Sequence, residues 1–214
     1  MKIFIAGDST AANKQANKRP ESGWGEYLKD FISPHIEIRN YAENGRSTKS
    51  FIAEGRLFQI ETEIEPGDFL LIQFGHNDSK DDTLRYTNPN TDYLDNLERF
   101  AVTATSNHAT PIFISSITRR KFIDGKLDLN AVSDYPDAMK RFCDAHGFPF
   151  IDMYQISQKI ISQLGDTSSK KFYNYLKPLE HPNYPDGITD DTHFSPYGAK
   201  MYASLIAIEL KKFI

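Results

Sequence analysis

Apolar residues along the chain form two kinds of pattern that alternate. Short runs rich in β-branched and aromatic residues predict strands at 2–6, 36–41, 69–74, 111–115 and 148–151. Longer stretches with helical spacing predict helices at 26–32, 50–64, 91–108, 135–146, 153–164 and 196–214. Polar segments at 13–22, 75–90 and 177–194 are predicted to be loops. We therefore expect a mainly parallel five-stranded sheet with helices on both faces, in a single three-layer α/β domain spanning residues 1–214.

Small and polar residues follow the first three predicted strands. Gly-Asp-Ser-Thr occupies 7–10, Asn-Gly-Arg-Ser occupies 44–47, and Gly-His-Asn-Asp occupies 75–78. A fourth polar segment, Asp-Asp-Thr-His at 190–193, lies near the C-terminus. In open α/β sheets, ligands bind at the edge where the carboxyl ends of the strands meet. We therefore expect the four segments to gather beside Ser9.

The residue types in these segments are the parts that a serine nucleophile needs. A serine hydroxyl requires a base within hydrogen-bond reach, and His193 can be that base. Asp190, three residues earlier, could orient the imidazole and stabilise its charged form. An oxyanion needs fixed donors, which the backbone N–H groups of Ser9 and Gly45 and the side-chain amide of Asn77 would supply.

Other interpretations of the same segments stay open at this point. Asp8 or Ser9 could simply be a helix N-cap, and Asp191 could be the orienting acid in place of Asp190. A metal site is a further alternative, with four potential ligands, His76, Asp78, Asp190 and His193. Their spacing matches no zinc signature, and a serine mechanism needs the histidine free. We therefore expect no metal and no cofactor.

Candidate substrate-binding residues are Arg46, Trp24 and His76. Arg46 could pair with a uronate carboxylate, as could Arg56, although a structural ion pair is an equal alternative. Trp24 could stack on a sugar or pack in the core. We interpret the basic cluster 119–121 as solvated rather than facing a sugar. Three other histidines, His35, His108 and His146, are interpreted as surface or core residues.

Composition and charge limit which kinds of partner the protein is expected to bind and where in the cell it is expected to act. Among 214 residues, 39% are hydrophobic and 25% are charged, as in ordinary globular proteins. The formal net charge of −4 argues against nucleic acid and against an anionic membrane surface. Cys143 is the single cysteine, so an intrachain disulfide is excluded. We expect its side chain to be buried. The apolar start is too short for a signal peptide, so we expect a cytoplasmic protein.

As a set, the four segments resemble the sequence blocks of the SGNH (GDSL) hydrolases, in the same order and spacing. More narrowly, stretches at 44–51, 54–56, 74–78, 119–122 and 190–195 are similar to the rhamnogalacturonan acetylesterase branch. The resemblance extends from Gly7 to Gly198. It implies a flavodoxin-like α/β/α fold and hydrolysis of acetyl esters on pectic sugars.

The resemblance also assigns roles to individual residues. It makes Ser9 the nucleophile, His193 the base and Asp190 its orienting acid, and it places Ser9, Gly45 and Asn77 in an oxyanion hole. We expect a serine esterase that deacetylates carbohydrate, with acetylated rhamnogalacturonan (pectin) oligosaccharides as its partner. The alternatives are an acetylxylan, small-ester or lipid esterase of the same superfamily, and a catalytically silent carbohydrate-binding domain.

Overall fold

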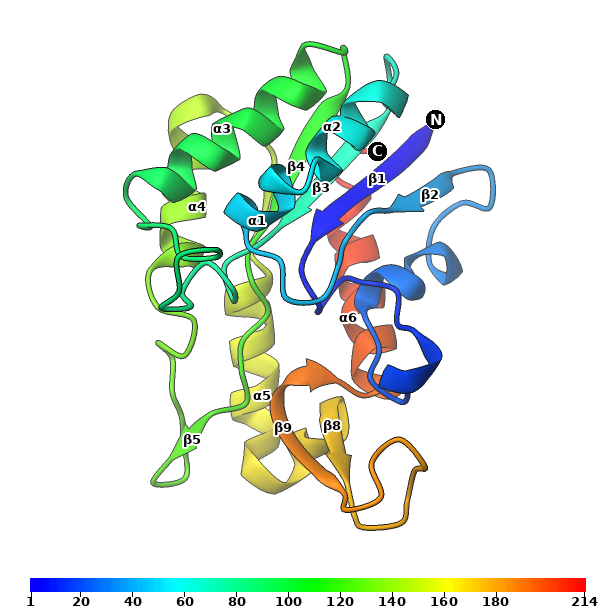
Figure 1. Cartoon of the computed structure of the whole chain (residues 1–214), viewed down its shortest axis with the longest axis vertical. Coiled ribbons are helices and arrows are strands. Elements are labelled where there is room, and N and C mark those ends of the chain that lie inside the picture. Colours follow the sequence, from blue (N-terminus) through cyan, green and yellow to red (C-terminus); the bar gives the residue numbers. More distant parts are fainter.

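Five parallel strands form the central sheet of the computed structural model, which describes all 214 residues (Figure 1). The strand order is β2-β1-β3-β4-β7, and every neighbouring pair is parallel. The strands are β1 (Lys2–Gly7), β2 (Glu37–Asn40), β3 (Phe69–Gln73), β4 (Thr110–Ile114) and β7 (Phe150–Ile151). The predicted parallel five-stranded sheet is therefore confirmed.

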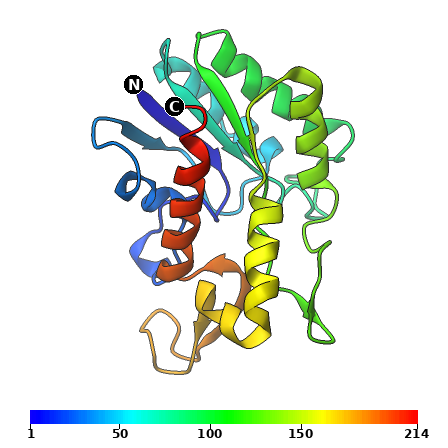
Figure 2. The ribbon, with the colours of Figure 1, turned by 180° about the vertical axis from the view of Figure 1, so that it is seen from behind.

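Side chains of β1 alternate between two apolar clusters, one on each face of the sheet. Ile3 and Ile5 pack on one side, and Phe4 and Ala6 pack on the other. Both faces are buried, which is why the strands of such a sheet are nearly continuous apolar runs. The helices between β2 and β7 in the chain cover the face of Phe4, while the two helices after β7 cover the face of Ile3 (Figures 1 and 2).

The helices agree with the apolar spacing along most of the chain. Their bounds are α1 (Thr48–Ala53), α2 (Arg56–Glu63), α3 (Asp92–Thr105), α4 (Tyr135–His146), α5 (Met153–Ser169) and α6 (Pro196–Leu210). The α4 helix has the predicted bounds, and α5 continues past its predicted end through a kink at Gly165. None of the helices is both long and apolar enough to span a lipid bilayer.

Two helix predictions are wrong in detail. The expected helix 50–64 is divided into α1 and α2, because Gly55 adopts a left-handed φ of 74°. The expected helix 26–32 is replaced by two 3₁₀ turns, η2 (Trp24–Glu26) and η3 (Leu28–Asp30). There the Trp24 N–H donates to the Thr10 carbonyl, so the segment is tied to the loop after β1. Two further 3₁₀ turns are η1 (Ala16–Lys18) and η4 (Lys170–Phe172).

The predicted loop 177–194 is also wrong, because its second half is a strand. β8 (Tyr173–Leu176) and β9 (Ile188–Phe194) form an antiparallel hairpin. The register shifts within it: Asn174 pairs with Asp190, whereas the preceding Tyr173 pairs with Phe194. Residues 191–193 are therefore a bulge, a device that re-aims side chains next to active sites. A second, smaller hairpin joins β5 (Phe122–Ile123) to β6 (Lys126–Leu127).

Candidate active site

Ser9 lies in a tight turn directly after β1 and is 5% exposed. The buried carboxylate of Asp8 shapes this turn, because its Oδ1 accepts hydrogen bonds from the Thr10 N–H (2.8 Å) and hydroxyl (2.7 Å). No helix begins at this turn, since the next element is η1 at Ala16. The N-cap interpretation of Asp8 and Ser9 is therefore wrong.

His193 and Asp190 reach Ser9 from the bulge of β9. His193 Nε2 lies 3.0 Å from Ser9 Oγ, and His193 Nδ1 lies 2.7 Å from Asp190 Oδ2. The second oxygen of Asp190 accepts the backbone N–H groups of Thr192 (2.8 Å) and His193 (2.9 Å), which fixes the carboxylate within its own strand. The three side chains form a hydrogen-bonded row from hydroxyl to imidazole to carboxylate.

The charges of this row stabilise each other. Burial alone would raise the pKa of Asp190. The hydrogen bond and charge of His193 lower it by more than burial raises it, so the pKa of Asp190 lies below its ordinary value. Burial lowers the pKa of His193, while the hydrogen bond and charge of Asp190 raise it. The net pKa of His193 lies above the ordinary value of 6.5. The imidazole is thus a stronger base than a free histidine.

Asp191, the alternative orienting acid, points to other partners. Its Oδ1 accepts a hydrogen bond from the Tyr175 hydroxyl and lies 2.9 Å from Arg120 Nε. Arg120 also pairs with Asp166, and its side chain is only 6% exposed. The interpretation of the cluster 119–121 as solvated is therefore wrong for Arg120, which anchors the strand that carries Asp190.

The loops that follow β1, β2 and β3 each carry an N–H donor of the predicted oxyanion hole. Neither the Ser9 N–H nor the Gly45 N–H donates to any protein acceptor. Gly45 has a φ of 79°, a conformation that favours glycine. Asn77 Nδ2 donates to the Arg46 carbonyl (3.1 Å), which leaves its second hydrogen free. Three unpaired N–H donors thus remain in the segments that were predicted to form an oxyanion hole.

Asp78, which the sequence suggested only as a metal ligand, joins the loops of Gly45 and Asn77. It is fully buried, and its Oδ1 accepts from Thr48 N–H (3.0 Å) at the start of α1 and from the hydroxyl of Thr87 (3.0 Å). Burial raises the pKa of Asp78 to about 7, against the lowering effect of these hydrogen bonds. No group of three or more histidine, cysteine or acidic side chains is placed to hold a metal ion.

Two candidate substrate-binding residues are corrected by their burial. Trp24 is fully buried, and its Nε1–H donates to Gln73 Oε1 (2.7 Å), so its ring cannot stack on a sugar. His76 is 3% exposed, with Nδ1 3.3 Å from Asp8 Oδ2 and Nε2 2.8 Å from the Ile117 carbonyl. Both rings pack behind the turn of Ser9 rather than beside it.

Arg46 and Arg56 share an acidic partner but differ in position. Arg56 pairs with Glu54 (3.0 Å) and Glu43 (3.4 Å), as the ion-pair interpretation expects. Arg46 Nε lies 2.9 Å from Glu54, and its Nη1 donates to the carbonyl of Asn44 (2.7 Å). That carbonyl shares a peptide unit with the Gly45 N–H, so Arg46 also orients this donor.

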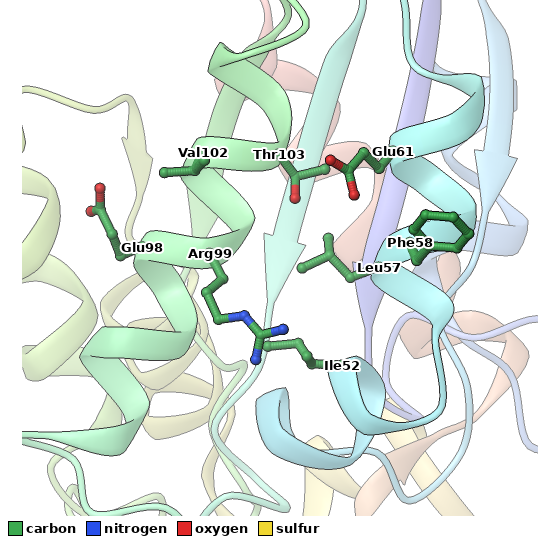
Figure 3. Close-up of a pocket in the computed structure, with 8 residues that line it drawn as sticks. All are labelled: Ile52, Leu57, Phe58, Glu61, Glu98, Arg99, Val102 and Thr103. Atoms are coloured by element: carbon green, nitrogen blue, oxygen red, sulfur yellow. The ribbon is translucent and has the colours of Figure 1, made fainter.

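A polar hollow of about 430 Å³ opens next to Gly45. Its lining is almost entirely polar or charged and consists of Gly45, Arg46, Ser50, Glu54, Asp82, Thr83, Leu84 and Arg85. A second hollow, of about 370 Å³, lies between α2 and α3, where Figure 3 shows Leu57 and Glu61 turned toward α3 and Arg99 extending toward Ile52. Neither hollow is lined by Ser9, Asp190 or His193, but the first shares Gly45 with the predicted oxyanion hole, whereas the second shares no residue with the predicted site.

Comparisons with known proteins agree with this geometry. The family model described as GDSL-like Lipase/Acylhydrolase matches residues 3–206. The chain is 41% identical over 207 residues to rhamnogalacturonan acetylesterase RhgT of Bacillus subtilis (strain 168), covering 97% of this chain and 88% of RhgT. It is 36% identical over 211 residues to the probable rhamnogalacturonan acetylesterase YesY of the same strain, covering 98% and 92%.

A solved structure shows the same fold. The crystal structure of the Bacillus subtilis protein YxiM superposes with a TM-score of 0.79 at 23% identity. The match covers 99% of this chain, which spans only 56% of the longer YxiM chain. The likeness therefore concerns the α/β fold and not the activity.

Proposed function

Because this chain belongs to the GDSL-like lipase/acylhydrolase family, we propose that it is a serine esterase that removes O-acetyl groups from carbohydrate. The observation that carries the proposal is the row Ser9–His193–Asp190, with contacts of 3.0 and 2.7 Å, beside three unpaired amide donors. A hydroxyl, a base and an oriented carboxylate in this order are the parts of a serine hydrolase.

The first half-reaction transfers the acetyl group to the enzyme. Ser9 Oγ attacks the ester carbonyl carbon, while His193 Nε2 takes the hydroxyl proton. The negative charge that develops on the carbonyl oxygen is met by the N–H groups of Ser9 and Gly45 and by the free amide hydrogen of Asn77. Loss of one such donor typically costs about 10²–10³-fold in turnover. His193 then gives its proton to the departing sugar oxygen.

The second half-reaction releases acetate by the same groups in the same roles. His193 removes a proton from water, which attacks the acetyl-Ser9 carbonyl. Collapse of this intermediate returns the proton to Ser9 Oγ and frees acetate. Asp190 stays ionised throughout and holds the imidazole with Nε2 toward Ser9. The mechanism needs no cofactor.

We propose acetylated rhamnogalacturonan oligosaccharides as the substrate, which would place the protein in pectin degradation. The support is the naming of both Bacillus subtilis relatives as rhamnogalacturonan acetylesterases, one of them as probable. Two parts of the sequence-based interpretation, the cytoplasmic location and the single domain, stay predictions.

Acetate release tests the substrate directly. The expected result is faster release from acetylated rhamnogalacturonan fragments than from acetylated xylan fragments, with acetyl p-nitrophenyl esters preferred over octanoyl esters. Equal or faster release from xylan would move the assignment to an acetylxylan esterase. A preference for octanoyl esters would indicate a lipid esterase, and binding of the oligosaccharide without any acetate release would indicate a carbohydrate-binding domain.

We further propose that the polar hollow beside Gly45 holds a sugar residue of the same oligosaccharide. Arg46 is the candidate ligand, because its Nη2 makes no hydrogen bond within the protein and its side chain is 31% exposed. Free guanidinium N–H groups suit the oxygens of sugars and carboxylates.

Replacing Arg46 with alanine is expected to raise KM for acetylated oligosaccharide by about tenfold, corresponding to about 1.4 kcal/mol of binding. Initial rates of acetate release give both constants: the rise in KM reports on the lost contact with the sugar, and kcat should also fall, because Arg46 orients the Gly45 N–H. The matched control is Arg56→Ala, which removes a neighbouring arginine that pairs with Glu54 but does not line the hollow. An unchanged KM in Arg46→Ala would show that the sugar does not enter the hollow.

A further inference from the structure

Lys14 is buried beside the nucleophile, although a lysine in a polar segment is ordinarily solvated. Its side chain is completely enclosed, and its Nζ contacts three oxygens. These are the carbonyl of Ser9, Oδ1 of Asn44 (2.6 Å) and Oε1 of Glu21 (2.8 Å). An ammonium has three N–H donors, so each contact uses one of them.

The ion pair with Glu21 offsets the free-energy cost of burying the Lys14 ammonium. Burial lowers the pKa of Lys14, while the charge and hydrogen bond of Glu21 raise it. Glu21 is itself only 6% exposed, and the same oxygen accepts a hydrogen bond from Asn44 Nδ2 (3.4 Å). Removing one member of such a pair leaves an uncompensated buried charge in the other.

The partners of Lys14 belong to the loops that carry the reaction rather than to the apolar core. Ser9 supplies the nucleophile and one amide donor, and Asn44 directly precedes Gly45, which supplies another. One ammonium bonded to both loops fixes how far apart the two backbone donors stand. The Gly45 loop is also held by Arg46 Nη1, which donates to the Asn44 carbonyl, and by Asn77 Nδ2, which donates to the Arg46 carbonyl.

We propose that Lys14, neutralised by Glu21, is a positioning residue that holds the Ser9 turn and the Asn44–Gly45 loop at the separation needed to bind the oxyanion. This inference rests on the proposed esterase function. It assigns a role to Lys14 and Glu21, which lie outside the four polar sequence segments. A compact ammonium is suited to this place, because three oxygens converge on one atom and a planar guanidinium could not bond all of them from there.

The pair also acts on His193 from a distance, with opposite signs. The charge of Glu21 raises the pKa of His193, and the charge of Lys14 lowers it. The other charge that acts on His193 is that of Asp190 on β9, its direct partner. The acid limb of the pH–rate profile is the range in which activity falls as His193 becomes protonated. Loss of either Lys14 or Glu21 alone should therefore shift this limb, and loss of both should return it close to its original pH.

The test compares Lys14→Met, Glu21→Gln and the double variant, with p-nitrophenyl acetate as the probe. We expect Lys14→Met to lower kcat by about 10–10²-fold, a large part of the effect of one lost oxyanion donor, with a smaller change in KM. Its acid limb should move to higher pH, and that of Glu21→Gln to lower pH. The double variant should keep the low kcat but return the limb toward that of the unchanged protein.

The control is Lys18→Met, which removes an exposed lysine from the same segment and should leave kcat and the acid limb unchanged. A folded Lys14→Met with kcat within twofold of the unchanged protein overturns the proposal, as does an equal loss in Lys18→Met. Should Lys14→Met not fold, Glu21→Gln decides, because an unmoved acid limb with full kcat in that variant also overturns it. Absence of any Ser9-dependent turnover in the unchanged protein would instead refute the esterase function.

Discussion

Replacing Ser9 with alanine is expected to lower the turnover of p-nitrophenyl acetate by about 10⁶-fold, the size of effect seen when a hydrolase loses its nucleophile. The fold should survive, because the only hydrogen bond of Ser9 Oγ is the 3.0 Å one with His193 Nε2. The measurements are kcat by absorbance and the melting temperature, which should stay close to that of the unchanged protein.

A fluorophosphonate gives an independent reading of the same residue. The unchanged protein should gain one covalent label on Ser9, detected by intact mass, and Ser9→Ala should gain none. Ser106→Ala, which truncates an exposed serine after α3, should be labelled and active as before. Turnover of Ser9→Ala within tenfold of the unchanged protein would show that another group is the nucleophile.

Replacing Asp190 with asparagine is expected to lower kcat by about 10⁴-fold, because the amide can no longer hold His193 in the tautomer that has Nε2 free to accept a proton. Its effect on pH dependence follows from the charges. In the unchanged protein Asp190 raises the pKa of His193 above 6.5, so activity should begin to fall at a pH above 6.5 as His193 becomes protonated. Without the carboxylate that pKa falls, and the acid limb should move to lower pH.

Two neighbouring acids serve as comparisons for Asp190→Asn. Asp186→Asn alters an exposed residue of the same hairpin connection and should leave the pH–rate profile unchanged. Asp191→Asn should have a smaller effect than Asp190→Asn, since Asp191 bonds to Tyr175 and Arg120 and not to His193. An equal loss of kcat in Asp190→Asn and Asp191→Asn would contradict the assignment of the orienting acid.

The sheet could be predicted from sequence because both of its faces are buried. In β3 the four residues 69–72 are all apolar because they lie between two packed faces, and this run predicted the strand to within one residue of its observed end. Three of the four polar segments could be placed together because they follow parallel strands, which end at a common edge. The fourth, with Asp190 and His193, lies on the separate hairpin of β8 and β9, so only its residue types and its resemblance to known hydrolases linked it to Ser9.

The features that could not be predicted depend on contacts between distant segments. β9 carries few apolar residues and a bulge, so neither alternation nor composition distinguishes it from a loop. A lysine side chain ordinarily lies at the surface, and the sequence left open whether Trp24 packs in the core or stacks on a sugar. The positions of both depend on partners in other parts of the sequence. Lys14 is buried because Glu21 neutralises it, and Trp24 because Gln73 accepts its N–H.

In the proposed mechanism, the active site is assembled from two separate parts of the chain. The base and its orienting acid, His193 and Asp190, lie within four residues of each other on β9. The nucleophile Ser9 and the oxyanion donors lie on loops that follow strands of the main sheet. Hydrogen bonds between the two parts include Ser9 to His193, 184 positions apart, the Ser22 N–H to the Phe194 carbonyl (3.0 Å), and Asn183 Nδ2 to the carbonyls of Ala16 (2.7 Å) and Arg19 (2.9 Å). A displacement of the hairpin would therefore separate His193 from Ser9 and abolish turnover even where the central sheet stays folded.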